Sequence, residues 1–214
     1  MSTGEKMEGP TMTPIRSVEL NWIRLAIGCG LATSVVYPSL IFIPLPQLAT
    51  ITLAAAVGPL LGIASVGLYR FLRLHQPSVS AQLAAACNFL GGALFSTMLL
   101  VQLAVRIRAA GQPVEQQVVA VWLGLDVAWD VYIALGTAMF AWAMRAHPRF
   151  GLGFAGSGLL LAVLLLALNF FTFPEPPGES NLIDLGPLVG LWYLVVTVQM
   201  WRSLSWVKQA LAAS

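Results

Sequence analysis

The sequence has few charged residues for its length. Of its 214 residues, 9% are Asp, Glu, Lys or Arg, whereas 58% are hydrophobic. Soluble globular proteins carry about 25% charged residues, so this composition excludes a soluble domain and predicts an integral membrane protein. The formal net charge of +2 is also too small to indicate a protein that binds nucleic acid. The lipid bilayer is therefore the first partner that we expect.

The predicted membrane spans contain no histidine or lysine and no closely spaced pair of cysteines. Both histidines, His75 and His147, lie in predicted loops, which excludes the intramembrane bis-histidine ligation of a b-type cytochrome. The two lysines lie near the chain ends, so a retinal Schiff base within the membrane is excluded as well. Cys29 and Cys87 lie on different predicted helices, so we expect free thiols instead of a C-x-x-C redox pair.

Two enzyme patterns can also be set aside. A serine protease would need an intramembrane histidine as the base for Ser157, and none is present. The spacing of Gly151, Gly153 and Gly156 matches a dinucleotide fingerprint, but it opens an apolar stretch instead of following a strand. We therefore predict that the protein is not an enzyme, and we expect no catalytic, cofactor-binding or metal-binding residues.

Six apolar stretches are long enough to cross a bilayer, which needs about 20 helical residues. Prolines and basic residues separate them, and proline disfavours continuing a helix. The predicted spans are 20–43, 47–71, 79–105, 117–144, 151–173 and 184–201. This pattern predicts an all-α polytopic bundle of six transmembrane helices. Residues 1–19 are predicted to be a flexible cytoplasmic tail, 20–206 the transmembrane domain and 207–214 a short cytoplasmic tail.

Basic residues are divided unevenly between the two predicted sides of the membrane. The N-terminal tail, the loops after the second and fourth spans and the C-terminus hold eight lysines and arginines, whereas the opposite loops hold two, Arg106 and Arg108. Cytoplasmic flanks carry the excess of lysine and arginine. We therefore predict a multi-pass cell-membrane protein that has both termini in the cytoplasm.

Small residues recur at every fourth position in the first two spans. Ala54, Gly58 and Gly62 form a stripe on the second span, and Gly28 and Ala32 form a shorter stripe on the first. Membrane helices approach closely along such stripes. We therefore expect both stripes to be helix contacts.

Two carboxylates lie inside the fourth apolar stretch. A charged group at the centre of a bilayer costs about 2.5–3.5 kcal/mol on insertion scales, so it normally faces the interior of a bundle. Asp126 and Asp130 are four residues apart and share one helix face. With about 1.5 Å of rise per residue, Asn88 and Gln199 are expected at the depth of Asp130. The sequence therefore predicts a buried polar layer made by these four residues.

Two roles are open for this layer. Two acids and two amides can lock helices together as a structural hydrogen-bond network, whereas a protonatable carboxyl can carry a proton. Arg24 is the one cation close enough to reach the layer. It either pairs with Asp130 or extends to the cytoplasmic interface. The two halves show no convincing inverted repeat, which makes a transporter less expected.

Short patterns in the C-terminal half resemble those of a group of membrane proteins. They are Trp129-Asp130, Leu135-Gly136-Thr137, His147-Pro148-Arg149-Phe150-Gly151, Asp184-Leu185-Gly186-Pro187 and Gly190-Leu191-Trp192-Tyr193. In these residues the chain resembles small bacterial multispan membrane proteins of unknown function. The resemblance implies a helical bundle in the bacterial inner membrane and brings no activity with it.

Two functional classes follow. We expect a non-enzymatic membrane component that has a structural, assembly or regulatory role, and another membrane protein or a second copy of the chain is its expected protein partner. The alternative is a small proton-coupled transporter or carrier that uses Asp126 and Asp130.

Overall fold

The protein folds as a bundle of helices. The computed structural model describes residues 14–213, and within that range it contains seven helices and no strand. The helices are α1 (Pro14–Phe42), α2 (Gln47–Arg73), α3 (Val79–Ala109), α4 (Gln116–Met144), α5 (Gly151–Thr172), α6 (Gly186–Arg202) and α7 (Leu204–Ala213). Five of these, α1 to α5, are long and apolar enough to cross a membrane. The prediction of an all-α fold is therefore confirmed for this part of the chain.

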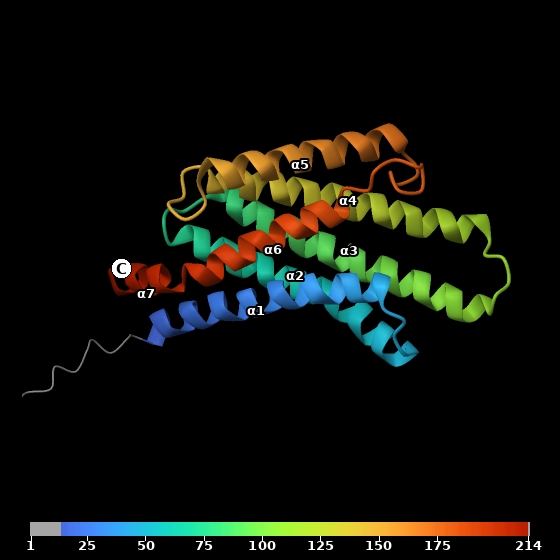
Figure 1. The fold of residues 1–214 in the computed structure, drawn as a ribbon, viewed down its shortest axis with the longest axis horizontal. Coiled ribbons are helices and arrows are strands. Elements are labelled where there is room, and N and C mark those ends of the chain that lie inside the picture. The colour runs from blue at the N-terminus through green and yellow to red at the C-terminus, as the bar shows by residue number, and fades with distance from the viewer. Residues whose placement is uncertain (1–13, 214) are drawn as a thin grey trace, which may run out of the picture.

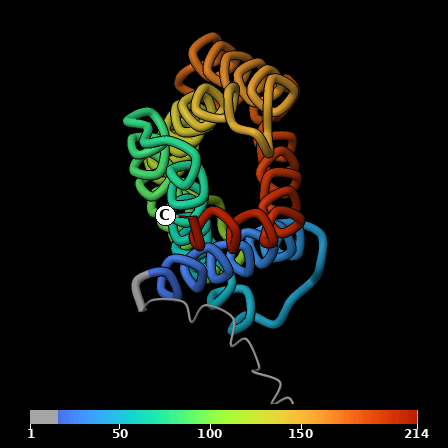
Figure 2. The backbone as a smooth tube through the Cα atoms, turned by 90° about the vertical axis from the view of Figure 1, so that its left-hand side faces the viewer, coloured from blue at the N-terminus to red at the C-terminus, as the bar shows by residue number. Residues whose placement is uncertain are grey.

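The first six helices run back and forth along the long axis of the molecule (Figure 1). Seen from the end that carries α7, they form a ring in chain order, with α6 between α5 and α1 (Figure 2). Helices α1 to α4 each pack closely against the next helix in the chain, whereas α6 packs less extensively against α1 and still less against α5. With 17 residues, α6 spans about 25 Å and is the shortest of the six.

Helices extend further toward both ends of the chain than the sequence predicts. Helix α1 begins at Pro14, so residues 14–19 of the predicted flexible tail are helical, while residues 1–13 lie outside the described residues. Proline is favoured at the first position of a helix. Glu19 accepts a hydrogen bond from Arg70 Nη1 at 3.0 Å and also pairs with Arg73. These two ion pairs hold the first turns of α1 against the end of α2.

The C-terminal tail is also folded, through residue 213. Helix α7 crosses the end of the ring (Figure 2), and its Val207 and Leu211 are buried in the same core as Phe71 of α2 and Met200 of α6. The predicted boundary at 206 and the predicted tail at 207–214 therefore do not match the helix. The reason is that apolar residues four positions apart form one buried face of α7.

The small-residue stripe of α2 is a helix contact, as predicted. A Cβ atom added to Gly58 would lie 2.1 Å from the backbone oxygen of Gly92 on α3, so the two backbones touch at this point. The backbone N–H of Gly58 also donates to Ser96 Oγ at 2.9 Å. In the shorter stripe on α1, Gly28 does not make the predicted helix contact. Gly28 is exposed with open space beside it, whereas Gly30, two residues further on, packs directly against Thr197 of α6.

Candidate functional site

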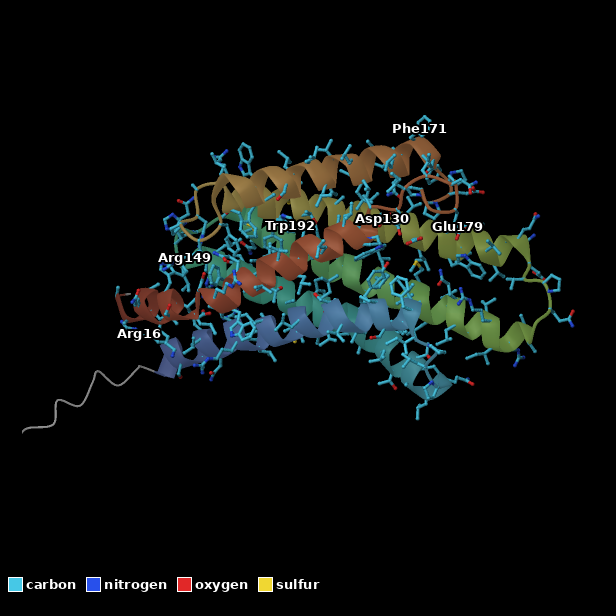
Figure 3. The ribbon with its side chains drawn as sticks, viewed as in Figure 1. Arg16, Asp130, Arg149, Phe171, Glu179 and Trp192 are labelled. Atoms are coloured by element: carbon cyan, nitrogen blue, oxygen red, sulfur yellow. The ribbon has the colours of Figure 1, made fainter. Side chains whose placement is uncertain are left out.

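The central acid of the predicted polar layer, Asp130, is paired with an amide that the sequence did not single out. Asp130 is 5% exposed, and its Oδ2 accepts a hydrogen bond of 2.8 Å from Nδ2 of Asn169 on α5. Asn169 is fully buried and also donates to the backbone oxygen of Leu165 at 3.0 Å. Figure 3 shows Asp130 well inside the bundle, between the levels of Trp192 and Glu179. The contact joins α4 to α5.

A second buried polar cluster joins α2, α3, α4 and α6. Nδ2 of Asn88 donates to Ser65 Oγ at 3.1 Å and to the Tyr193 hydroxyl at 2.8 Å. Oγ1 of Thr137 lies 2.7 Å from the carbonyl oxygen of Ile133 and 3.0 Å from the Tyr193 hydroxyl. Because the single hydrogen of Thr137 goes to this carbonyl, Tyr193 must donate to Thr137. The bonds therefore run in one direction, from Asn88 through Tyr193 and Thr137 to the backbone.

The second acid of the predicted layer is not part of either cluster. Asp126 is half-buried on α4, three residues before Trp129, and forms no hydrogen bond or ion pair with the described residues. Its electrostatic neighbours are Asp184 and Glu179, which lie in the segment between α5 and α6. Asp126 thus belongs to an acidic end of the bundle instead of a midplane layer.

Two other predicted members lie elsewhere. Gln199 donates through Nε2 to the backbone oxygen of Arg149 at 2.6 Å, which places it at the basic end of the bundle. The prediction that it lies at the depth of Asp130 is wrong because α6 is short and does not start level with α4 (Figure 1). Arg24 is exposed on α1 and forms no ion pair with the described residues. Of the two alternatives for Arg24, the pair with Asp130 is therefore not formed.

The predicted single layer is thus two separate clusters. Of the five predicted residues, Asp130 and Asn88 are buried and hydrogen-bonded, but Thr137, beside Asn88, lies seven residues beyond Asp130 on α4. Seven residues of helix amount to about 10 Å. The sequence analysis missed Asn169, Ser65 and Tyr193. Asn169 could have been predicted from the sequence. Asp130 and Asn169 lie at similar numbers of residues from the short loop between α4 and α5, so the two residues come to a similar level in the bundle.

An aromatic cluster fills the basic end of the bundle. His147, in the loop between α4 and α5, is 3% exposed and packs against Phe71 and Trp206, with ring centroids 5.4 and 5.2 Å away. Its Nδ1 accepts a hydrogen bond from the backbone N–H of Arg149, and its buried Nε2 has no hydrogen-bond partner among the described residues. Burial, and then the nearby His75 and Arg149, lower the pKa of His147 to about 4. The ring is therefore neutral near pH 7.

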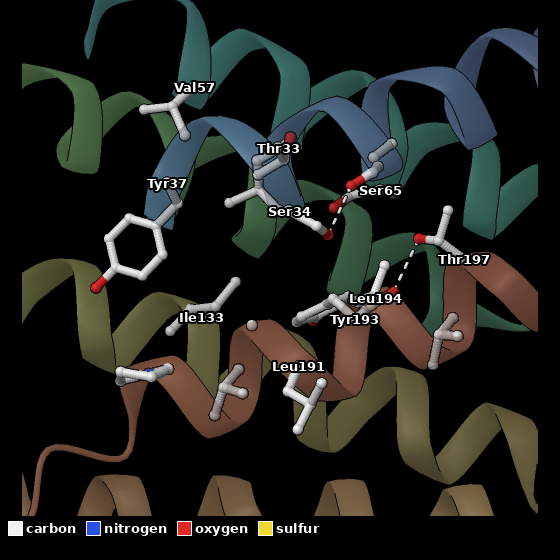
Figure 4. A pocket seen from close by; sticks show the side chains of 18 of the residues that line it. Thr33, Ser34, Tyr37, Val57, Ser65, Ile133, Leu191, Tyr193, Leu194 and Thr197 are labelled. Carbon is white, nitrogen blue, oxygen red and sulfur yellow. Dashed lines mark hydrogen bonds between the residues drawn. The ribbon is translucent and has the colours of Figure 1, made fainter. Parts of the chain in front are cut away.

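A cavity of about 320 Å³ lies between α1, α2 and α6 (Figure 4). Its wall is mostly apolar, and the polar groups in it are hydroxyls that include those of Ser65, Tyr193 and Tyr37. Trp129 and Ile133 line it from α4, but Asp126 and Asp130 do not. The cavity therefore touches the Asn88 cluster through Ser65 and Tyr193, and it is separate from the Asp130–Asn169 contact.

The described residues hold no group of three or more histidine, cysteine, aspartate or glutamate side chains that could bind a metal ion. Cys29 and Cys87 are both free thiols. The arrangement can therefore join helices through hydrogen bonds and can enclose an apolar molecule. No family model, curated protein or solved structure matches this chain.

Proposed function

We propose that the protein is a multi-pass protein of the bacterial inner membrane that crosses the bilayer six times, with both termini in the cytoplasm. Five long apolar helices support the membrane location, and α6 would supply the sixth crossing. The loops at the α7 end carry arginines, whereas the opposite end carries Glu175, Glu179 and Asp184 together with Arg106 and Arg108. Cytoplasmic flanks carry the excess of basic residues, which supports this orientation.

Thiol labelling tests the orientation. In a background in which Cys29 and Cys87 are replaced with alanine, single cysteines are introduced by Ala146→Cys and Gly178→Cys. Both positions are exposed and lie in loops at opposite ends of the bundle. A membrane-impermeant maleimide should label the Gly178→Cys protein in intact cells, and the Ala146→Cys protein only after the cells are permeabilised. Labelling of Ala146→Cys in intact cells would contradict the proposal.

Within the membrane, we propose a non-enzymatic structural, assembly or regulatory role, exercised toward another membrane protein or a second copy of the chain. The observation that carries this proposal is the contact between Asp130 and Asn169. An acid that moves protons needs a path to water, whereas Asp130 is buried, bonded to an amide of the next helix and absent from the cavity wall. This geometry favours an acid that fastens α4 to α5.

Two substitutions at one position test this role. Asp130→Leu removes one of the two acceptors of the Asn169 amide and should lower the free energy of unfolding in detergent by about 1–3 kcal/mol. Asp130→Asn keeps an acceptor of the same shape, and its new amide can donate to the unpartnered Oδ1 of Asn169. It should therefore retain most of the stability. If both variants were as stable as the wild type, the contact would have no structural role.

The alternative of a proton-coupled carrier is supported by one observation. Asp126 is half-buried, and its carboxyl forms no hydrogen bond or ion pair with the described residues. A carrier of this kind would lose transport on Asp126→Asn while its stability in detergent stayed unchanged. Unchanged transport in that variant would remove Asp126 from the candidates.

A further inference from the structure

The cavity between α1, α2 and α6 is long and narrow. Its lining runs from Ala26 to Phe42 on α1 and from Gly186 to Met200 on α6. At 1.5 Å per residue, these segments are about 24 Å and about 21 Å long. A volume of about 320 Å³ along such a length leaves room for an extended chain. The shape therefore favours a hydrocarbon chain as the occupant.

The chemistry of the wall also favours a hydrocarbon chain. Three hydroxyls that line the cavity each donate to the backbone of their own helix: Thr33 to Cys29, Ser34 to Gly30, and Thr197 to Tyr193, at 2.8–2.9 Å. Their hydrogens are therefore not available to a ligand. The lining contains no charged residue. A bound molecule would thus contact mainly carbon atoms along most of the cavity.

The end of the cavity near the start of α6 is more polar than the rest of the cavity. The Tyr37 ring packs edge-on against Phe95, and Figure 4 shows it projecting from α1 toward α4 and α6. Its hydroxyl forms no hydrogen bond with the described residues. The charged groups whose field reaches this hydroxyl are three acids, Asp184, Asp126 and Asp130, in order of decreasing effect. A polar headgroup placed here would meet a free hydroxyl and negative charge, which favour an amine over a phosphate alone.

We propose that this cavity binds one acyl chain of an aminophospholipid, whose ammonium group lies near Tyr37, Asp126 and Asp184. The surrounding bilayer supplies such a molecule, and the loose packing of α6 against its neighbours leaves a lateral way in. The inference rests on the proposed membrane location. The bound chain fills the space that α6 leaves between itself and α2, and so it completes the core of the bundle.

Photolabelling in vesicles tests the inference. The purified protein is reconstituted with phosphatidylethanolamine that carries a diazirine in one acyl chain, and labelled residues are mapped by mass spectrometry. Leu61, Ser65 and Leu68 of α2 line the cavity but are buried from the surrounding lipid. Label on these residues requires a chain inside the cavity. Label on Leu160 and Phe171, which are exposed on α5, reports only that the protein lies in the bilayer.

A cavity-filling variant and a matched control sharpen the result. Gly190 lines the cavity and Gly124 does not, yet both are exposed helical positions where an added Cβ atom meets nothing within 4 Å. Gly190→Phe should remove the label from α2 and leave it on α5, whereas Gly124→Phe should change neither. A phosphatidylglycerol probe with the same chain should label α2 less than the phosphatidylethanolamine probe does.

Each other outcome overturns a defined part of the account. Label on α5 without label on α2, or label on α2 that Gly190→Phe does not reduce, would refute the cavity site. Equal labelling of α2 by the two lipids would refute the role of the acids at its mouth. No label on either helix would refute the membrane location on which the inference rests.

Discussion

Replacing Asn169 with leucine removes the one side-chain donor that the structure gives to Asp130. Leucine has nearly the shape of asparagine, so the change deletes two hydrogen bonds, to Asp130 Oδ2 and to the Leu165 carbonyl, without opening a large cavity. A buried acceptor that loses its partner costs about 1–3 kcal/mol. Oδ1 of Asn169 has no hydrogen-bond partner within residues 14–213, and its removal offsets part of this cost. We therefore expect a loss of roughly 2 kcal/mol, or about 4–8 °C in melting temperature.

The double variant gives the decisive comparison. When Asp130→Leu is combined with Asn169→Leu, both polar partners are replaced by apolar groups, and such a pair is nearly neutral. The double variant should therefore be more stable than either single variant, so the coupling free energy should exceed the loss in either single variant, which is roughly 2 kcal/mol. The assay is thermal unfolding in detergent. Asn21→Leu, at an exposed position of α1, is the control and should change stability by less than about 0.5 kcal/mol. Additive losses in the double variant would refute the contact.

Three further outcomes follow from particular contacts. Gly58→Ala should destabilise the protein by about 1–3 kcal/mol, since its Cβ would meet the Gly92 backbone oxygen, whereas Gly124→Ala should be neutral or stabilising in the same unfolding assay. Tyr193→Phe breaks the chain between Asn88 and Thr137 and should cost about 1–2 kcal/mol, measured against wild type in detergent. His147, whose pKa falls to about 4 on folding, binds fewer protons in the folded state than in the unfolded state between pH 6.5 and 4. The contribution of His147 to stability should therefore fall by roughly 2 kcal/mol from pH 7.5 to pH 5, measured in chemical unfolding as the change in the difference between the wild type and His147→Phe.

The helices could be predicted from the sequence because hydropathy and proline fix where a membrane helix starts and stops. The predicted second span begins at residue 47, as α2 does, and the predicted fourth span ends at residue 144, as α4 does. The contact of Gly58 with a neighbouring helix could also be predicted, from the spacing of small residues along α2. Small residues at every fourth position leave no side chain between two backbones.

The partners of Asp130 could not be predicted with the same method. Multiplying the number of residues by the helical rise gives the position of a residue along its own helix. It gives neither the rotation of that helix about its axis nor the level at which a neighbouring helix begins. Gln199 was misplaced because α6 is short, and Asn88 was misplaced by about two turns. Asn169 was overlooked although it lies on the helix that follows Asp130 directly. A short connection makes α4 and α5 antiparallel neighbours, so residues at similar distances from that loop are brought together.

Proton flux in liposomes tests the central claim, that Asp130 holds α4 against α5 and that neither Asp126 nor Asp130 carries protons. The wild type, Asp126→Asn and Asp130→Asn would each be reconstituted at equal density, and the decay of an imposed pH gradient would be followed with an internal dye. All three proteins should leave the gradient as stable as in protein-free liposomes. Faster decay with the wild type, abolished by Asp126→Asn or Asp130→Asn, would contradict the account.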